Sequence, residues 1–214
     1  MPFHHPSLDL LLSVAAGDQT SAVQKVVLAH AALCPECRVE LDKLESIGGA
    51  MLQQEPGVAM APDALEQALA AIGETERSAA VSVPDWLQLV PASVREIAAE
   101  VARNAAVPTG PSLNLLHTMG GDRETIEIIR IEPGKSIPTH AHDGIEYTLV
   151  LTGAFRDQLG VFAQGDLAIS DARHTHRPIA ESGETCIAMI VTTAALRFKG
   201  PLGLLQRVMT MGRR

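Results

Sequence analysis

The segment from His30 to Cys37 places one imidazole and two thiols at a spacing that can close around a single metal ion. Cys34 and Cys37 are separated by two residues, as in a zinc knuckle, and His30 lies one helical turn before Cys34. Because a structural zinc site takes four ligands, one more is required. The adjacent histidines His4 and His5 both supply candidates, so the sequence predicts a site of two cysteines and two histidines near the start of the chain.

A second set of metal-binding side chains stands in the later half of the chain. His140 and His142 are one residue apart, so both would point to the same face of a strand. Glu146 can return to that face if Asp143-Gly144 forms a bend, and His174-Thr175-His176 offers a third imidazole from a neighbouring strand. Three nitrogens and one carboxylate oxygen suit a divalent metal ion.

The residues around the first set predict three short helices. Leu8–Val14 and Ser21–Leu33 carry apolar side chains at helical spacing, and Thr20 or Ser21 can cap the second helix. A third helix begins at the metal cluster with Pro35 at its first position, where the missing N–H costs nothing. Pro35 therefore excludes one continuous helix through all three ligands and bends the chain at the metal.

A fourth helix is predicted after a linker. Gly48-Gly49 would end the third helix, and Gln53–Ala61 with its proline and glycine has the composition of a linker. Asp63 can cap the next helix, whose apolar side chains form one stripe at Leu65, Leu69 and Ile72. We expect this stripe to pack on the other three helices; the alternative is a detachable helix that binds a partner.

The pattern changes after Trp86. Ser93–Glu96 is a capping box that opens a helix to about Asn104, and short β-type segments follow, separated by turns. The clearest strands are Thr125–Ile131, Glu146–Leu151, Asp166–Ser170 and Cys186–Thr193. Their spacing is typical of a small β-barrel or jelly roll, so we expect a separate all-β domain in the second half.

Composition limits the function. The chain has 214 residues and a formal net charge of −8, which argues against direct binding to nucleic acid and leaves a basic protein partner open. No apolar run approaches the roughly 20 residues that span a membrane, and the start lacks the form of a signal peptide. Three cysteines make no disulfide framework, so we expect a cytoplasmic protein with no membrane partner.

The second set of ligands resembles the cupin pattern. The first cupin motif is matched by Gly134, His140, His142, Glu146 and Gly153. The second begins at Gly165 and reaches His176 after ten residues, with Asp171 where cupins usually have proline. This match selects His176 over His174 as the third histidine ligand.

Joined to the His-Cys-Cys motif, the cupin resembles the ChrR-type zinc-binding anti-sigma factors of bacteria over nearly the whole chain. The first histidine ligand of that family falls at His5, so the resemblance implies zinc held by His5, His30, Cys34 and Cys37. It also implies a divalent metal, which we expect to be zinc, on His140, His142, Glu146 and His176. The implied fold is α+β and multidomain: a zinc-binding helical bundle at 1–80, a linker and helix at 81–110, a cupin jelly roll at 111–200 and a tail at 201–214.

The resemblance implies a regulator and not an enzyme. The N-terminal domain would hold an extracytoplasmic-function sigma factor and hide its polymerase-binding surfaces, while the cupin senses a stress such as reactive oxygen species and acts through the linker. The alternative is a metal-dependent cupin dioxygenase or isomerase with an accessory zinc domain. A redox role for Cys34-Pro35-Glu36-Cys37 is weaker, since it leaves His30 unused, and Cys186 is expected to be a buried strand residue.

Overall fold

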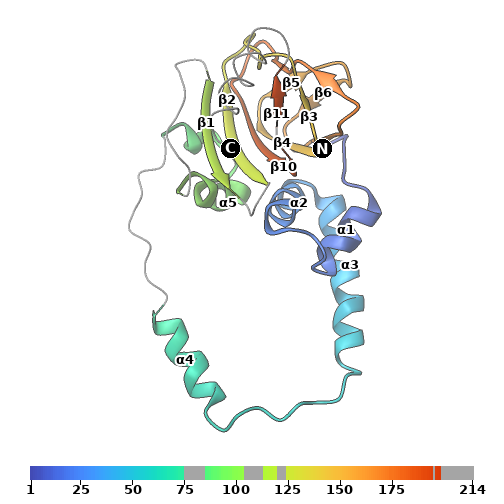
Figure 1. Ribbon diagram of the computed structural model, residues 1–214, viewed down its shortest axis with the longest axis vertical. Coiled ribbons are helices and arrows are strands. Elements are labelled where there is room, and N and C mark those ends of the chain that lie inside the picture. Colours follow the sequence, from blue (N-terminus) through green and yellow to red (C-terminus); the bar gives the residue numbers. More distant parts are fainter. Residues whose placement is uncertain (75–84, 104–112, 120–123, 195, 199–214) are drawn as a thin grey trace, which may run out of the picture.

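The computed structural model describes residues 1–74, 85–103, 113–119, 124–194 and 196–198, which form a group of helices set against a β-sandwich (Figure 1). The order predicted from the sequence, helices first and an antiparallel β-domain second, is the order observed. The helical elements are α1 (Leu8–Ala15), α2 (Ser21–Leu33), α3 (Pro35–Leu52), α4 (Ala64–Glu74), the 3-10 helix η1 (Asp85–Leu89) and α5 (Ala92–Arg103).

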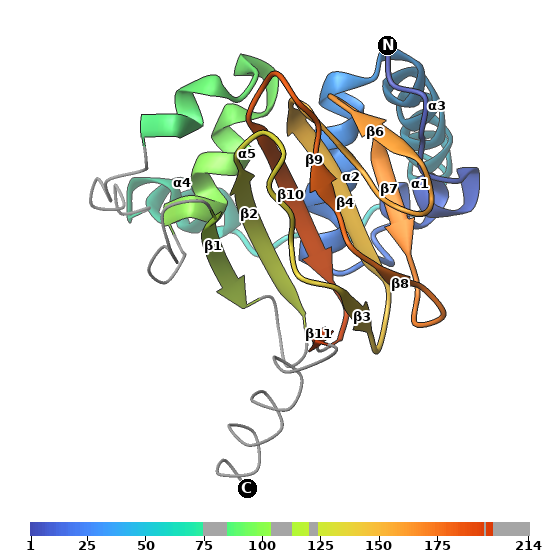
Figure 2. The same cartoon turned by 90° about the horizontal axis from the view of Figure 1, so that it is seen from above.

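The β-domain contains one sheet of five strands and two of three, all paired antiparallel. The large sheet has the order β1-β2-β10-β4-β7, which runs across Figure 2. The small sheets have the orders β11-β3-β8 and β6-β5-β9. The strands are β1 (Leu113–Met119), β2 (Thr125–Ile131), β3 (His140–His142), β4 (Glu146–Thr152), β5 (Ala154–Arg156), β6 (Val161–Ala163), β7 (Leu167–Ser170), β8 (Thr175–His176), β9 (Ile179–Ala180), β10 (Cys186–Thr192) and β11 (Leu196–Phe198).

The ends of the first helices follow the predicted signals, with two exceptions. Thr20 caps α2 by accepting the N–H of Val23, and Pro35 opens α3 as expected. Gly48-Gly49 does not end α3, because glycine costs only about 1 kcal/mol inside a helix and neither residue has the positive φ of a glycine stop. Helix α5 begins at Ala92, one residue before the predicted cap at Ser93.

Both faces of the central strands β4 and β10 are buried. Along β4 the odd-numbered side chains Tyr147, Leu149 and Leu151 join a core that includes residues of α1, α2, α3 and α5. The even-numbered Val150 joins the second core, inside the sandwich. Helix α2 contacts β4 and β10, and α5 contacts β1 and β2, so the helices cover the outer face of the sheet. The two halves therefore share a core, and the expected division at 1–80, 81–110 and 111–200 stays a prediction.

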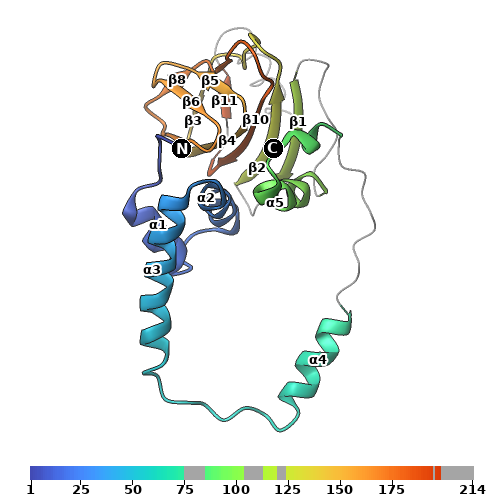
Figure 3. The ribbon, with the colours of Figure 1, turned by 180° about the vertical axis from the view of Figure 1, so that it is seen from behind.

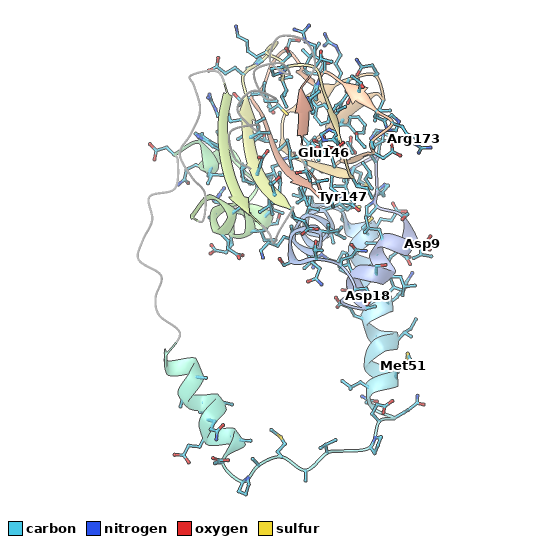
Figure 4. All side chains as sticks on the ribbon, in the orientation of Figure 1. Asp9, Asp18, Met51, Glu146, Tyr147 and Arg173 are labelled. Atoms are coloured by element: carbon cyan, nitrogen blue, oxygen red, sulfur yellow. The ribbon has the colours of Figure 1, made fainter. Side chains whose placement is uncertain are left out.

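Helix α4 does not pack on the first three helices, so that expectation was wrong. Figures 1 and 3 show it well apart from the rest of the described chain, and Leu65 and Leu69 are 70% and 59% exposed. The outer half of α3 also extends from the body, and Figure 4 shows Met51 on this part. Helix α4 thus stands apart from the body, as the alternative requires, and its role in binding a partner stays a prediction.

Among the described residues, no helix is long and apolar enough to cross a membrane. The expected tail at 201–214 lies outside the described residues.

Candidate metal centres

The first cluster forms where α2 ends and α3 begins. His30 lies in the last turn of α2, Cys34 is the cap of α3 and Cys37 follows in its first turn. The Cys34 side chain makes no capping hydrogen bond, which leaves its sulfur for the site. His5 comes from the segment ahead of α1, and one donor atom from each of the four residues lies within 4.8 Å of the others.

The separations within this cluster fit a tetrahedral metal. His5 Nδ1 lies 3.4 Å from the Sγ atoms of both Cys34 and Cys37. Zinc bonds of ~2.3 Å to sulfur and ~2.0 Å to nitrogen at tetrahedral angles separate such donors by about 3.5 Å. Two thiolates and two imidazoles are also a common donor set of structural zinc sites.

His30 has one ring nitrogen that the protein does not satisfy. The side chain is fully buried, its Nδ1 lies 2.8 Å from the carbonyl oxygen of Gly165, and its Nε2 has no hydrogen-bond partner among the residues that the structure describes. Burial lowers the pKa of His30, so the neutral ring donates its Nδ1–H to Gly165 and presents the Nε2 lone pair. This is the form in which histidine binds a metal.

The pKa of the Cys37 thiol fits a metal-binding role for the cysteine pair better than a redox role. Burial, and then the neighbouring Cys34, raises the pKa of Cys37 to about 12, whereas a redox-active cysteine pair needs a lowered pKa. A bound zinc ion would supply the positive charge that stabilises both thiolates.

The second cluster lies inside the β-sandwich, where Figure 4 places Glu146. Strand β3 supplies His140 and His142, β4 begins at Glu146, and β8 supplies His176, which pairs directly with His140. The Nε2 atom of His176 lies 2.9 Å from that of His140 and 3.0 Å from that of His142. Donors of a metal at ~2.1 Å and at right angles are about 3.0 Å apart, so the three imidazoles fit one ion with other positions open.

Glu146 completes this cluster. Its Oε2 lies 3.2 Å from His142 Nε2, and its Oε1 lies 3.6 Å from His176 Nε2. All four side chains are buried. Burial raises the pKa of Glu146 to about 7, and burial also lowers the pKa of His140 to about 4 and of His142 to about 3. A divalent cation would offset the cost of an ionised carboxylate here, while the imidazoles stay neutral.

Two of the three imidazoles are held in place by a hydrogen bond at Nδ1, the ring nitrogen that points away from the cluster. His140 Nδ1 lies 2.8 Å from the carbonyl of Pro138, and His176 Nδ1 lies 2.9 Å from a carboxylate oxygen of Asp157. Burial raises the pKa of Asp157, but hydrogen bonds from His176 and the backbone N–H of Leu159 outweigh it and lower the pKa below its usual range. Such partners fix the ring orientation and increase the basicity of the metal-binding nitrogen.

His4 and His174, which the sequence offers as alternative ligands to His5 and His176, lie outside the two clusters. The His4 ring packs at a tilt against Phe162 with a centroid separation of 4.5 Å, and its Nδ1 lies 3.3 Å from a carboxylate oxygen of Asp166. His174 lies on the surface with its Nδ1 3.1 Å from Asp171. The geometry thus brings together the eight residues expected from the resemblance.

A small apolar cavity adjoins the second cluster. It is lined by three residues of the cluster, by mostly aliphatic apolar side chains and by a few polar ones: His140, Glu146, His176, Ile129, Ile131, Ile137, Phe155, Ala168, Pro178, Cys186, Ala188, Ile190, Thr148, Asp157 and Ser170. Its volume of about 20 Å³ admits little more than a water-sized molecule, because one water needs about 10–15 Å³ on the same measure. Cys186 is fully buried, as expected.

Sequence reasoning missed three groups that support the clusters: Asp157, Asp166 and the carbonyl of Gly165. Asp157 follows a short strand and precedes a turn, which is a pattern shared by many loop residues. Gly165 was noted only as the start of a cupin motif. Their roles depend on contacts across 19 residues or more, for which a single sequence carries no local signal.

A family model, a curated protein and a solved structure are similar to this chain over much of its length. The model, described as the ChrR cupin-like domain, matches residues 96–196. The anti-sigma-E factor ChrR of Cereibacter sphaeroides is 34% identical over 199 residues, which cover 91% of this chain and 92% of the relative. A chain in the crystal structure of Rhodobacter sphaeroides SigE in complex with the anti-sigma ChrR matches with a TM-score of 0.68 and 30% identity, covering 88% of this chain and 98% of that chain.

Proposed function

This chain belongs to the ChrR family of anti-sigma factors, and we propose from this membership that it binds an extracytoplasmic-function sigma factor and keeps it from initiating transcription. The resemblance seen in the sequence is confirmed. Because the relative that matches nine-tenths of the chain is an anti-sigma factor, the alternative of a cupin dioxygenase or isomerase is set aside. A negative regulator of this kind would act in the cytoplasm, where the sigma factor meets RNA polymerase.

The observation that carries the proposal is an exposed apolar surface from the outer half of α3 to α4, which we call the arm. Among the described side chains of the arm, seven large apolar ones are each at least 59% exposed: Ile47, Met51, Leu52, Val58, Met60, Leu65 and Leu69. A group of this size on one contiguous segment is typical of a surface that a protein partner covers. An amphipathic helix laid into an apolar groove is a common form of such binding.

The charge of the arm indicates the kind of partner. Residues 42–74 contain six acidic side chains and one basic side chain. A partner with an apolar groove and a basic rim would complement this surface, since opposite charges at a rim speed association and favour the correct partner. Nucleic acid does not fit a surface of this sign.

Substitutions on α4 test the proposal in the full-length protein. The double variant Leu65→Asp and Leu69→Asp should lose binding of the co-expressed sigma factor and restore transcription from its promoter in a reconstituted assay. Gln67→Asp, which adds a charge to the polar side of the same helix, should keep binding. Retention of full affinity by the double variant would contradict the role of the arm.

The same proposal includes both ligand sets and a division of labour between them. His5, His30, Cys34 and Cys37 would hold a structural zinc ion, and His140, His142, Glu146 and His176 would hold a divalent metal in the cupin half. Such a metal would supply positive charge and open coordination positions beside the small cavity. The cavity volume of about 20 Å³ suits a small signal molecule such as a reactive oxygen species.

A comparison of two histidine variants tests the sensing role. His140→Ala should keep repression but fail to release the sigma factor under oxidant stress, measured with a promoter reporter. His174→Ala, a surface histidine outside both clusters, should release it as the wild type does. Normal release by the His140 variant would locate the sensor elsewhere in the protein.

A further inference from the structure

We propose that the turn between β6 and β7, residues Gly165 and Asp166, positions the two histidine ligands of the N-terminal zinc site, so that the cupin half completes this site. The inference rests on the zinc site of the proposed function. It adds two positioning residues that lie more than a hundred residues from the ligands in sequence.

Gly165 fixes His30. The carbonyl oxygen of Gly165 accepts a hydrogen bond of 2.8 Å from His30 Nδ1, and both atoms are buried. This bond selects the tautomer with the proton on Nδ1 and leaves Nε2, which has no partner in the described part of the chain, for the metal. It is the arrangement that orients metal-bound histidines in many proteins, with the acceptor supplied here by the cupin half.

Asp166 fixes the segment that carries His5. One carboxylate oxygen accepts the backbone N–H groups of Phe3 at 2.6 Å and His4 at 3.0 Å, and the other accepts the N–H of Ala163 at 2.8 Å. The N–H of Leu167 donates in turn to the carbonyl of His4 at 3.0 Å. Phe3 and His4 are therefore both hydrogen-bonded to the cupin half, and His5 is the next residue in the chain.

The approach of the two segments requires glycine in the turn. Gly165 has φ +89°, and a Cβ built on it would lie 2.7 Å from Cγ of Pro2. A Cβ would also lie 3.7 Å from Cβ of Leu33, at the end of α2. The turn is thus wedged between the N-terminal segment and the helix that carries His30.

The same turn is attached to the second metal cluster. Gly165 N–H donates to Val150 O at 2.8 Å, and Val150 N–H donates to Asp166 O at 3.1 Å. Strand β7 continues from the turn and pairs with β4, ending with Ser170 opposite Glu146. The segment from Gly165 to Ser170 therefore contacts both metal sites. Its start holds His30 and the residues next to His5, and its end pairs with Glu146 of the cupin cluster.

Asp166→Asn in the full chain tests the inference, because it keeps the size of the side chain and removes one acceptor oxygen. Cobalt(II) serves as the probe, since only the N-terminal site contains thiolates and gives sulfur-to-cobalt charge-transfer absorption. Loss of outer partners of metal ligands typically lowers affinity about 10- to 100-fold, and we expect a decrease of this size at the thiolate site. Asp171→Asn, the same change at the partly exposed carboxylate beyond the other end of β7, should stay within about twofold of the wild type.

The outcomes separate the inference from its premise. If the wild-type chain shows no thiolate-to-cobalt absorption, the zinc site itself is contradicted, and with it part of the proposed function. A normal wild type together with an Asp166 variant of undiminished affinity would overturn the inference alone. Metal retained at the cupin site shows that a variant is folded; if Asp166→Asn loses both metals, Gly165→Ala is the deciding variant, and wild-type cobalt affinity in it overturns the inference.

Discussion

Replacing Gly165 with alanine should loosen the zinc site without touching a ligand. Gly165 has φ +89°, so alanine there costs the backbone about 1–2 kcal/mol. Gly134 has φ +73° and open space around its Cβ position. Gly134→Ala therefore carries a similar backbone cost and no new contact, which makes it the matched control.

The difference between the two variants comes from Pro2. A Cβ 2.7 Å from Pro2 Cγ lies about 1 Å inside the optimum for two carbons, so the N-terminal segment must move. Movement of that size breaks or lengthens the 2.6 Å bond from Phe3 to Asp166, and a hydrogen bond to a charged group contributes about 1.5–3 kcal/mol. If about 1.4 kcal/mol of this is lost, the displaced His5 weakens metal binding about tenfold, since 1.4 kcal/mol is a factor of ten.

Competition with a chromophoric chelator measures the zinc affinity of both variants, and cobalt absorption assigns the change to the thiolate site. We expect about a tenfold decrease for Gly165→Ala and less than about twofold for Gly134→Ala. Equal affinities in the two variants would refute the reasoning, because the N-terminal segment could then leave the cupin without moving His5. Urea unfolding of each variant separates the common backbone cost from the effect on the metal.

Three further predictions follow from the burial of Cys186 and Met189 and from the contact of Asp157 with the metal-ligand candidate His176. Burial raises the pKa of Cys186 to about 12, so iodoacetamide at roughly pH 8 should leave this thiol unmodified until the chain is denatured, as mass spectrometry can check. Met189→Ala, in the core between helices and sheet, should lower the free energy of unfolding by about 2–5 kcal/mol, whereas Met60→Ala on the exposed arm should change it by less than about 0.5 kcal/mol in urea titrations. Asp157→Asn should lower metal affinity of the cupin site about 10- to 100-fold through His176, with cobalt absorption at the thiolate site unchanged.

The ligands were predictable because their chemistry is local. His30, Cys34 and Cys37 are adjacent on two consecutive helices, and Pro35 determines the bend between them. His140 and His142 share a face by the alternation of a strand. His5 was different: the residues alone left His4 and His5 open, and only the family resemblance selected between them.

The covering of the large sheet was missed although the sequence contains a sign of it. All positions from Cys186 to Val191 are apolar, and β10 is buried along its whole length. A strand with one solvated face alternates apolar and polar side chains, so a continuous apolar run indicates burial on both faces. The sign does not say which segment covers the outer face, because that choice depends on contacts between α2 and strands far away in sequence.

The position of α2 changes how the two halves can communicate. Helix α2 carries His30 and contacts both α3 and β4, the strand that begins at the metal-cluster residue Glu146. The resemblance implies that the cupin acts through the linker, which stays a prediction. A signal at one site changes affinity at another only if it interacts differently with the two states of the second site. The shared core and the Gly165-Asp166 turn supply a direct contact between the two halves through which such a difference can act. Under the proposed function, reciprocity requires that any factor by which cupin metal binding changes sigma affinity is also the factor by which sigma binding changes cupin metal affinity, and paired titrations of the full chain would show whether the two factors agree.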